Sequence, residues 1–142
     1  MMKLTTLGRH VLIEYYNCDK DILKDHDKVE AIMNEAARVS GATIVESCFH
    51  TFNPYGVSGA VIISESHLTI HTWPEYGYAS VDVFTCGDTV DPWRAEDYLQ
   101  KALKAELSDS YEIGRGMADK IHKYSNGEIV VESFKPVEVA AK

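Results

Sequence analysis

Apolar residues recur along the chain in two periods, and these predict two helices among several strands. From about Asp21 to Ser40 they fall three or four positions apart, which lines one face of a helix. Gly41 follows the last periodic residue and suits a C-terminal cap. A second helix is predicted to begin with Asp91 as N-cap and Pro92 at the first helical position, where proline's missing N–H costs nothing. The predicted buried stripes are Val29, Ile32, Met33, Ala36 and Ala37 in the first helix, and Ala95, Leu99, Ala102 and Leu103 in the second.

Segments rich in Val, Ile, Thr and aromatic residues predict five strands before the second helix. Turns are predicted at residues 53–56 and 73–77, where proline and glycine gather. After Glu106 the pattern weakens and the glycines predict loops, with one last strand near residues 129–134. The five strands are His10 to Tyr16, Ala42 to Phe52, Val57 to Ser64, His67 to His71 and Tyr78 to Thr85.

This order of elements predicts an α/β (α+β) fold, a two-layer sandwich with two helices on one face of a mainly antiparallel sheet. The first strand is apolar on both sides, because Val11, Ile13 and Tyr15 alternate with Leu12. An uncovered sheet face should be polar. We therefore expect the second face to be buried against another copy in a homodimer, where Glu14 would need a partner or a role.

Composition narrows the class of protein. A chain of 142 residues fits a single domain, residues 1–142, and no stretch is long enough to span a membrane. Residues 1–9 lack the apolar core of a secretory signal, so a cytoplasmic protein is expected. The formal net charge of -8 argues against non-specific nucleic-acid binding. Three cysteines without close spacing, Cys18, Cys48 and Cys86, argue for reduced thiols rather than disulfides or a zinc ribbon.

Serine and histidine gather between residues 55 and 77, and three interpretations compete. His67, Thr69 and His71 fit the polar face of a half-buried strand. His67 and His71 with Cys86 could instead bind zinc. The third interpretation is a nucleophilic or self-processing serine with a histidine nearby. Composition and spacing do not choose among them.

Residues 65–78 closely resemble the processing-site segment of the prokaryotic S-adenosylmethionine decarboxylases. Further segments resemble the same family in the same order, from roughly Leu7 to Ala105. The processing-site segment reads Glu65-Ser66-His67-Leu68-Thr69-Ile70-His71-Thr72-Trp73-Pro74-Glu75-Tyr76-Gly77-Tyr78, and the others are Leu7-Gly8-Arg9-His10, Gly41-Ala42-Thr43-Ile44-Val45, Pro54-Tyr55-Gly56-Val57-Ser58-Gly59 and Val83-Phe84-Thr85-Cys86-Gly87.

The resemblance implies that the chain cuts itself between Glu65 and Ser66, giving residues 1–65 (beta chain) and 66–142 (alpha chain). The Ser66 hydroxyl would convert the preceding amide to an ester, β-elimination would leave dehydroalanine, and hydrolysis would give a covalent pyruvoyl group. In the family this cofactor forms a Schiff base with S-adenosylmethionine and releases CO2. The product supplies aminopropyl groups for spermidine synthesis. No metal is implied.

The resemblance also implies three further catalytic residues. Ser58 would hold the tetrahedral processing intermediate, His71 would take the Ser66 α-proton, and Cys86 would return a proton to the substrate. Without the resemblance, Ser58 and Cys86 would be interpreted as small buried strand residues. In the family the site lies between subunits.

Two positions match the family's substrate-binding residues: Phe52, to stack on adenine, and Glu75, to hold the ribose hydroxyls. A core phenylalanine and a solvated turn glutamate are the alternatives. An arginine or ornithine decarboxylase with the same fold and pyruvoyl group is the nearest rival function. A non-catalytic relative and a zinc-binding module are more distant rivals.

Strict alternation would place Ser66 with Leu68 and Ile70, on the opposite face from His71. For His71 to reach Ser66, the chain must bend near Glu65 and Ser66, where a scissile bond can store backbone strain, or the two residues must meet across a fold.

Overall fold

The computed structural model describes residues 4–125 and 135–137. Its strands are β1 (Leu4–Tyr16), β2 (Ile44–Thr51), β3 (Val57–Ile63), β4 (Ser66–Trp73), β5 (Tyr78–Cys86), β6 (Leu107–Met117) and β7 (Lys135–Val137). Its helices are α1 (Lys20–Leu23), α2 (His26–Val39), the 3-10 turn η1 (Pro74–Tyr76), α3 (Pro92–Ala102) and α4 (Ala118–Tyr124).

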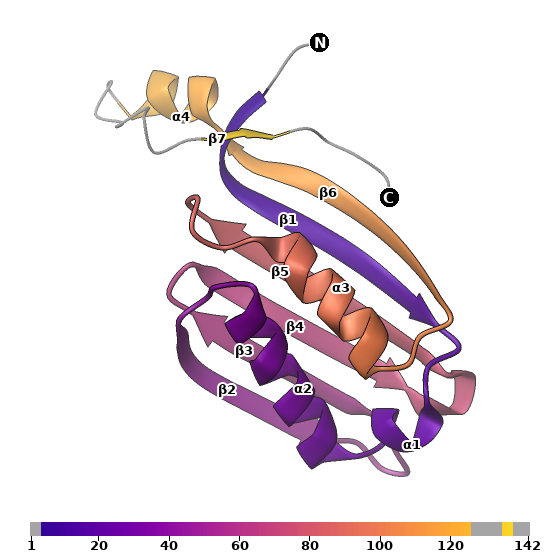
Figure 1. The fold of residues 1–142 in the computed structure, drawn as a ribbon. Helices are drawn as coiled ribbons and strands as arrows, with labels where there is room; N and C mark the ends of the chain where they lie inside the picture. Colours follow the sequence, from indigo (N-terminus) through magenta and orange to yellow (C-terminus); the bar gives the residue numbers. More distant parts are fainter. Residues whose placement is uncertain (1–3, 126–134, 138–142) are drawn as a thin grey trace.

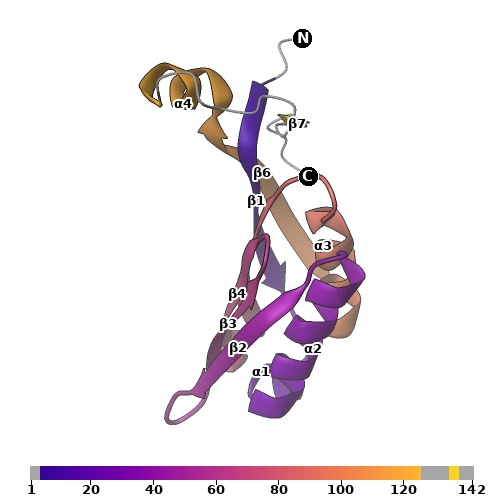
Figure 2. The same cartoon turned by 90° about the vertical axis from the view of Figure 1, so that its left-hand side faces the viewer.

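One antiparallel sheet organises the chain (Figure 1). Its order is β2-β3-β4-β5-β1-β6, and β7 pairs with the start of β1. Strands β2 to β5 follow one another as hairpins, whereas β1 lies between β5 and β6, which come much later in the sequence. Figure 2 shows α1, α2 and α3 on one face of the sheet. The predicted two-layer arrangement is confirmed.

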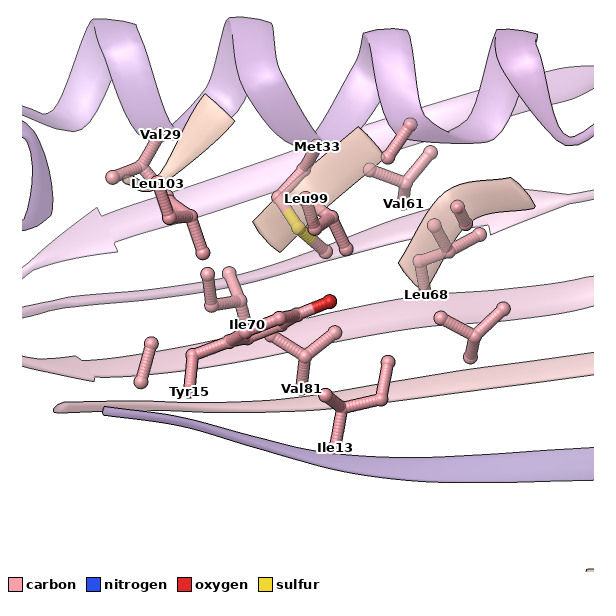
Figure 3. Packing of buried hydrophobic residues seen from close by; sticks show 14 of the residues in the cluster. Ile13, Tyr15, Val29, Met33, Val61, Leu68, Ile70, Val81, Leu99 and Leu103 are labelled. Carbon is pink, nitrogen blue, oxygen red and sulfur yellow. The ribbon is translucent and has the colours of Figure 1, made fainter. Parts of the chain in front are cut away.

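The core lies between the sheet and these helices (Figure 3). Alternate positions of the inner strands face the helices, so residues that are two apart are buried together. Tyr15 is fully buried, and its hydroxyl donates to the Glu96 carbonyl oxygen at 2.8 Å. Burying each Leu or Ile contributes about 1.5–3 kcal/mol, so this layer supplies much of the fold's stability. The sheet contributes Val11, Ile13, Val61, Leu68, Ile70, Val81 and Val83, and the helical layer contributes Val29, Met33, Leu99 and Leu103.

The first predicted helix is two helices, which corrects the sequence-based expectation. Asp25 lies between α1 and α2 in an extended conformation, and its side chain accepts from the backbone N–H groups of Asp27 and Lys28. An aspartate at an N-cap starts a new helix because it satisfies donors that lack an intrahelical partner. The predicted caps at Gly41 (φ +91°) and Asp91 are both confirmed.

The prediction of loops after Glu106 is wrong for residues 107–117, which form β6 along β1. Its helix-facing positions include Ser110 and Glu112, both buried, so the usual hydrophobic signal is missing there. Glu112 accepts from Arg9 Nε at 3.1 Å and from Trp93 Nε1 at 2.9 Å. These bonds make a buried carboxylate tolerable in a strand. The predicted strand at residues 129–134 lies outside the described residues.

The other face of the sheet carries apolar side chains that the described chain leaves exposed. It includes Ile62, Trp73, Tyr111 and Ile113, each exposed by 39–47%. Glu14 lies among them and accepts a hydrogen bond from the Tyr78 hydroxyl. Burial and this carboxylate raise the Tyr78 pKa to about 12. Burial of this face in a dimer stays a prediction. Within the described ranges, no helix has the length and apolarity needed to cross a bilayer.

Candidate active site

The scissile bond predicted from the sequence lies in a tight hairpin between β3 and β4. Ile63 pairs with Ser66, so Ser64 and Glu65 form a two-residue turn. Ser66 begins β4 with φ +139°, a backbone conformation that costs a non-glycine residue about 1–3 kcal/mol. The predicted bend at Glu65 and Ser66 is therefore present, with backbone strain at the serine itself.

Hydrogen bonds from both neighbouring strands hold this turn. The Cys86 N–H donates to the Glu65 carbonyl oxygen at 2.8 Å, on the β5 side. On the β2 side, the Thr43 N–H donates to Glu65 Oε1 at 3.2 Å. The Ser64 N–H donates to the Thr43 carbonyl oxygen at 2.9 Å. The carbonyl group that Ser66 would attack is thus already polarised by an N–H donor.

Cys86 ends β5 beside this turn and shares a pocket of about 310 Å³ with Ser66. Phe84 and Arg115 also line it, and the Arg115 guanidinium lies 5.3 Å from the Phe84 ring centroid. Gly8 lets β1 approach closely, because a Cβ there would lie 2.5 Å from Phe84 Cε1. We define the processing end as the scissile turn together with Ser66, Cys86, Phe84, Arg115 and Gly8.

A neutral histidine lies next to the processing end. Arg115 Nη1 is 2.9 Å from His10 Nδ1, and a guanidinium can only donate, so this ring nitrogen carries no proton. Burial lowers the His10 pKa below its ordinary value, with Arg115 and His67 adding to the effect and Asp82 opposing it. The His10 ring stacks on Phe84 at 5.1 Å.

Ser58 and His71 meet across β3 and β4, as a directly paired couple. Ser58 Oγ lies 2.7 Å from His71 Nδ1. They line a second pocket, of about 280 Å³, together with the predicted substrate residues Phe52 and Glu75. We define the histidine end as Ser58, His71, Phe52 and Glu75 with the pocket that they line. Four of the predicted site residues therefore share one pocket.

Two aromatic residues of this pocket, Tyr55 and Trp73, were not predicted as site residues. Phe52, Tyr55 and Trp73 are exposed by 51%, 45% and 40%, although they are large and apolar. Tyr55 lies beside Pro54 and Trp73 lies beside Pro74. These positions were the signal in the sequence that could have identified them, because exposed aromatic residues in turns often mark binding surfaces.

The two ends are far apart within one chain. Ser66 is the first residue of β4 and His71 the sixth, a separation of about 16 Å along an extended strand. The expectation that His71 reaches Ser66 is not met inside a single chain. The zinc interpretation has no support either, since in residues 4–125 and 135–137 no three Cys, His or carboxylate side chains gather as metal ligands.

Comparison with known proteins identifies the family. The S-adenosylmethionine decarboxylase family model matches residues 9–116. S-adenosylmethionine decarboxylase proenzymes of Thermosipho africanus and Thermotoga maritima are each 58% identical over 118 residues, covering 83% of this chain and 91% of theirs. That of Caldanaerobacter subterraneus is 55% identical over 123 residues, covering 87% of this chain and 99% of its own.

A solved structure gives the same result. The adenosylmethionine decarboxylase of Aquifex aeolicus superposes with a TM-score of 0.75 at 36% identity, covering 80% of this chain and 93% of its own. Sequence, fold and family model agree over most of the chain, and the chain therefore belongs to the S-adenosylmethionine decarboxylase family.

Proposed function

We propose that this chain cleaves itself between Glu65 and Ser66 and then decarboxylates S-adenosylmethionine with a pyruvoyl group derived from Ser66. The observation that carries the proposal is the hairpin at the processing end. There a strained serine follows a carbonyl group that already accepts a hydrogen bond from Cys86. Family membership supports the same activity, and it does not favour an arginine or ornithine decarboxylase.

Self-cleavage begins with Ser66. Its Oγ adds to the Glu65 carbonyl carbon, the C–N bond breaks, and the freed amine takes up the hydroxyl proton, so that an ester replaces the amide. In the tetrahedral intermediate, negative charge develops on the Glu65 oxygen. The Cys86 N–H, at 2.8 Å, is a preformed donor to that oxygen.

Elimination then needs a base for the Ser66 α-proton. The electron pair of that C–H bond forms the Cα–Cβ double bond and expels the Glu65 carboxylate. Hydrolysis of the resulting dehydroalanine releases ammonia and leaves the ketone. His71 suits the role of base, because an imidazole nitrogen can accept a proton and Ser58 orients this ring.

A second copy of the chain would bring this base to Ser66. Both ends open on the uncovered face of the sheet, which also carries the exposed apolar residues described above. Packing two such faces together in opposite directions would set the histidine end of one copy against the processing end of the other. We propose a homodimer of processed alpha and beta chains with two shared sites.

Ser66 suits the pyruvoyl group, because it has the required hydroxyl, is half-buried, and opens on a pocket that also holds a thiol. That group would supply an electron sink for the decarboxylation. Cys86 would donate the proton that replaces CO2 on the substrate, since a thiol S–H is a proton donor.

The histidine-end pocket suits a nucleoside. Phe52, Tyr55 and Trp73 offer aromatic faces to a flat base and a sulfonium cation, and Glu75 can accept hydrogen bonds from a ribose diol. We propose that the product serves as the aminopropyl donor for spermidine. A cytoplasmic location agrees with cysteines that form no disulfide within the described residues.

The test is to incubate the purified chain and follow two products. Intact mass should show fragments of residues 1–65 and 66–142, the second beginning with a pyruvoyl group. Carboxyl-labelled S-adenosylmethionine should then release labelled CO2, whereas labelled arginine and ornithine should not. An uncleaved chain, or release from arginine or ornithine alone, would contradict the proposal.

A further inference from the structure

We infer that the Glu65 side chain is a positioning residue for self-cleavage, acting through the backbone of Thr43. The inference rests on the proposed function, because it concerns the bond that this function requires Ser66 to attack. It assigns a role to a carboxylate that the sequence singled out only as the residue before the cut.

The Glu65 side chain takes the place of a backbone acceptor at the end of the β2–β3 pairing. The β2–β3 ladder has a register shift between Glu46 and Ile44 and ends at the pair Ile44 and Ile63. The next residues, Thr43 and Ser64, are joined by one backbone hydrogen bond. The Thr43 N–H would complete that pairing with a backbone carbonyl. Instead it donates to Glu65 Oε1 at 3.2 Å, so a side chain takes the place of the backbone acceptor.

The hydrogen bond between Thr43 and the Glu65 side chain lies opposite the one that the Glu65 carbonyl oxygen accepts on the other side of the turn. Thr43 holds the Glu65 side chain from β2, while the Cys86 N–H holds the Glu65 carbonyl oxygen from β5. The scissile carbonyl is therefore fixed between two strands, directly before the positive φ of Ser66. A strained residue persists only where its surroundings over-determine it.

Fixing the carbonyl should accelerate the first step. The Ser66 oxygen must approach the Glu65 carbonyl carbon at a narrow range of angles, and a turn free to rotate reaches that geometry rarely. Glu65 takes no proton and does not touch the breaking bond through its side chain. Its contribution is orientation, which requires an acceptor oxygen and not a negative charge.

Three variants separate these possibilities. Glu65→Ala removes the acceptor, Glu65→Gln keeps an oxygen at the same place without the charge, and Glu46→Ala removes an exposed glutamate from the neighbouring strand β2 as the matched control. Each is purified uncleaved from a short expression, and the fraction cleaved is followed by intact mass, with and without hydroxylamine, which cleaves esters. Thermal unfolding of each uncleaved sample checks the fold.

We expect Glu65→Ala to cleave about tenfold more slowly, the effect of one lost hydrogen bond at a partly exposed site. Glu65→Gln should stay within about twofold of the unaltered chain, and Glu46→Ala should match it. Hydroxylamine should not restore the rate of Glu65→Ala, because ester formation is the slowed step.

Wild-type cleavage rates in Glu65→Ala would overturn the inference and leave the proposed function intact. So would equal slowing of Glu65→Gln and Glu65→Ala, since charge would then be the cause. Fast cleavage of Glu65→Ala in hydroxylamine would place the effect after the ester and overturn it too. Failure of the unaltered chain to cleave would overturn the inference together with the proposed function.

Discussion

The two ends of strand β4 differ in what they offer to the same reaction. The processing end has a strained serine, a hydrogen-bonded carbonyl group and a thiol. The histidine end has a serine–histidine pair and a pocket rich in aromatic residues, with no scissile bond beside it. In the proposed mechanism, one end holds the bond to be broken and the other holds the groups suited to break it. The difference supports the proposal that a single chain carries two halves of different sites.

Of the changes considered, removing the attacking hydroxyl of Ser66 should have the largest effect on cleavage. Ser66→Ala should abolish cleavage, because the ester cannot form without Oγ. The matched control is Ser64→Ala, two residues earlier in the same exposed turn, which should cleave at the ordinary rate. Intact mass after prolonged incubation reads both. Cleavage of Ser66→Ala at the same bond would remove the processing end from the mechanism.

Removing the base tests whether the histidine end takes part in the cleavage at the processing end. His71→Ala should slow cleavage about 10²–10⁴-fold, the range for a lost general base. His122→Ala, an exposed histidine on α4, is the control.

Co-expression of His71→Ala with Ser66→Ala sharpens the same test. In a mixed dimer, the intact His71 of the Ser66→Ala chain can serve the intact Ser66 of the other. With random pairing in a symmetric dimer, about half of the His71→Ala chains should then cleave at the ordinary rate. No rescue would contradict the shared site, and mass spectrometry distinguishes the two chains.

Substrate binding should depend on the histidine end to a smaller degree. Phe52→Ala should raise KM for S-adenosylmethionine about tenfold, because one aromatic–base stack is lost. Phe52→Tyr keeps the aromatic face and should stay close to the unaltered enzyme. Initial rates on fully processed protein measure both. An unchanged KM in Phe52→Ala would remove this residue from the proposed nucleoside site.

The smallest predicted effect is a pH dependence of stability at the processing end. Burial lowers the pKa of His10 in the folded state, so protonation favours the unfolded chain. Its contribution to stability is complete above the unfolded-state pKa, near 6.5, and decreases as the pH falls from there toward the lower folded-state pKa. Uncleaved Ser66→Ala protein should therefore lose less Tm between pH 7 and pH 5 when His10→Gln is added. An equal loss would contradict the assignment.

Local signals in the sequence were enough to predict much of the fold. The caps at Gly41 and Asp91 depend on residues within one turn, and the stripes of Val29 and Leu99 repeat with the helical period. The alternation of Val11 and Ile13 likewise marks one face of a strand. Each of these features is decided by neighbours a few positions away.

Long-range pairing decided what the sequence missed. Strand β6 buries Ser110 and Glu112, and its pairing with β1 and the contacts of Glu112 with Arg9 and Trp93 explain why a polar segment is a strand. Asp25 could have been recognised as an N-cap that separates two helices, but the continuous apolar stripe led to the prediction of one helix.

The candidate site divides in the same way. The family resemblance of the sequence was enough to propose which residues carry the chemistry: Ser66, His71 and Cys86, with Ser58 beside His71 once β3 and β4 pair. The tertiary structure alone decided that Ser66 and His71 lie at opposite ends of β4, and that the Cys86 and Thr43 N–H groups hold the scissile turn. The reason is that spacing along a chain records which side chains are present, whereas strand register sets which of them meet.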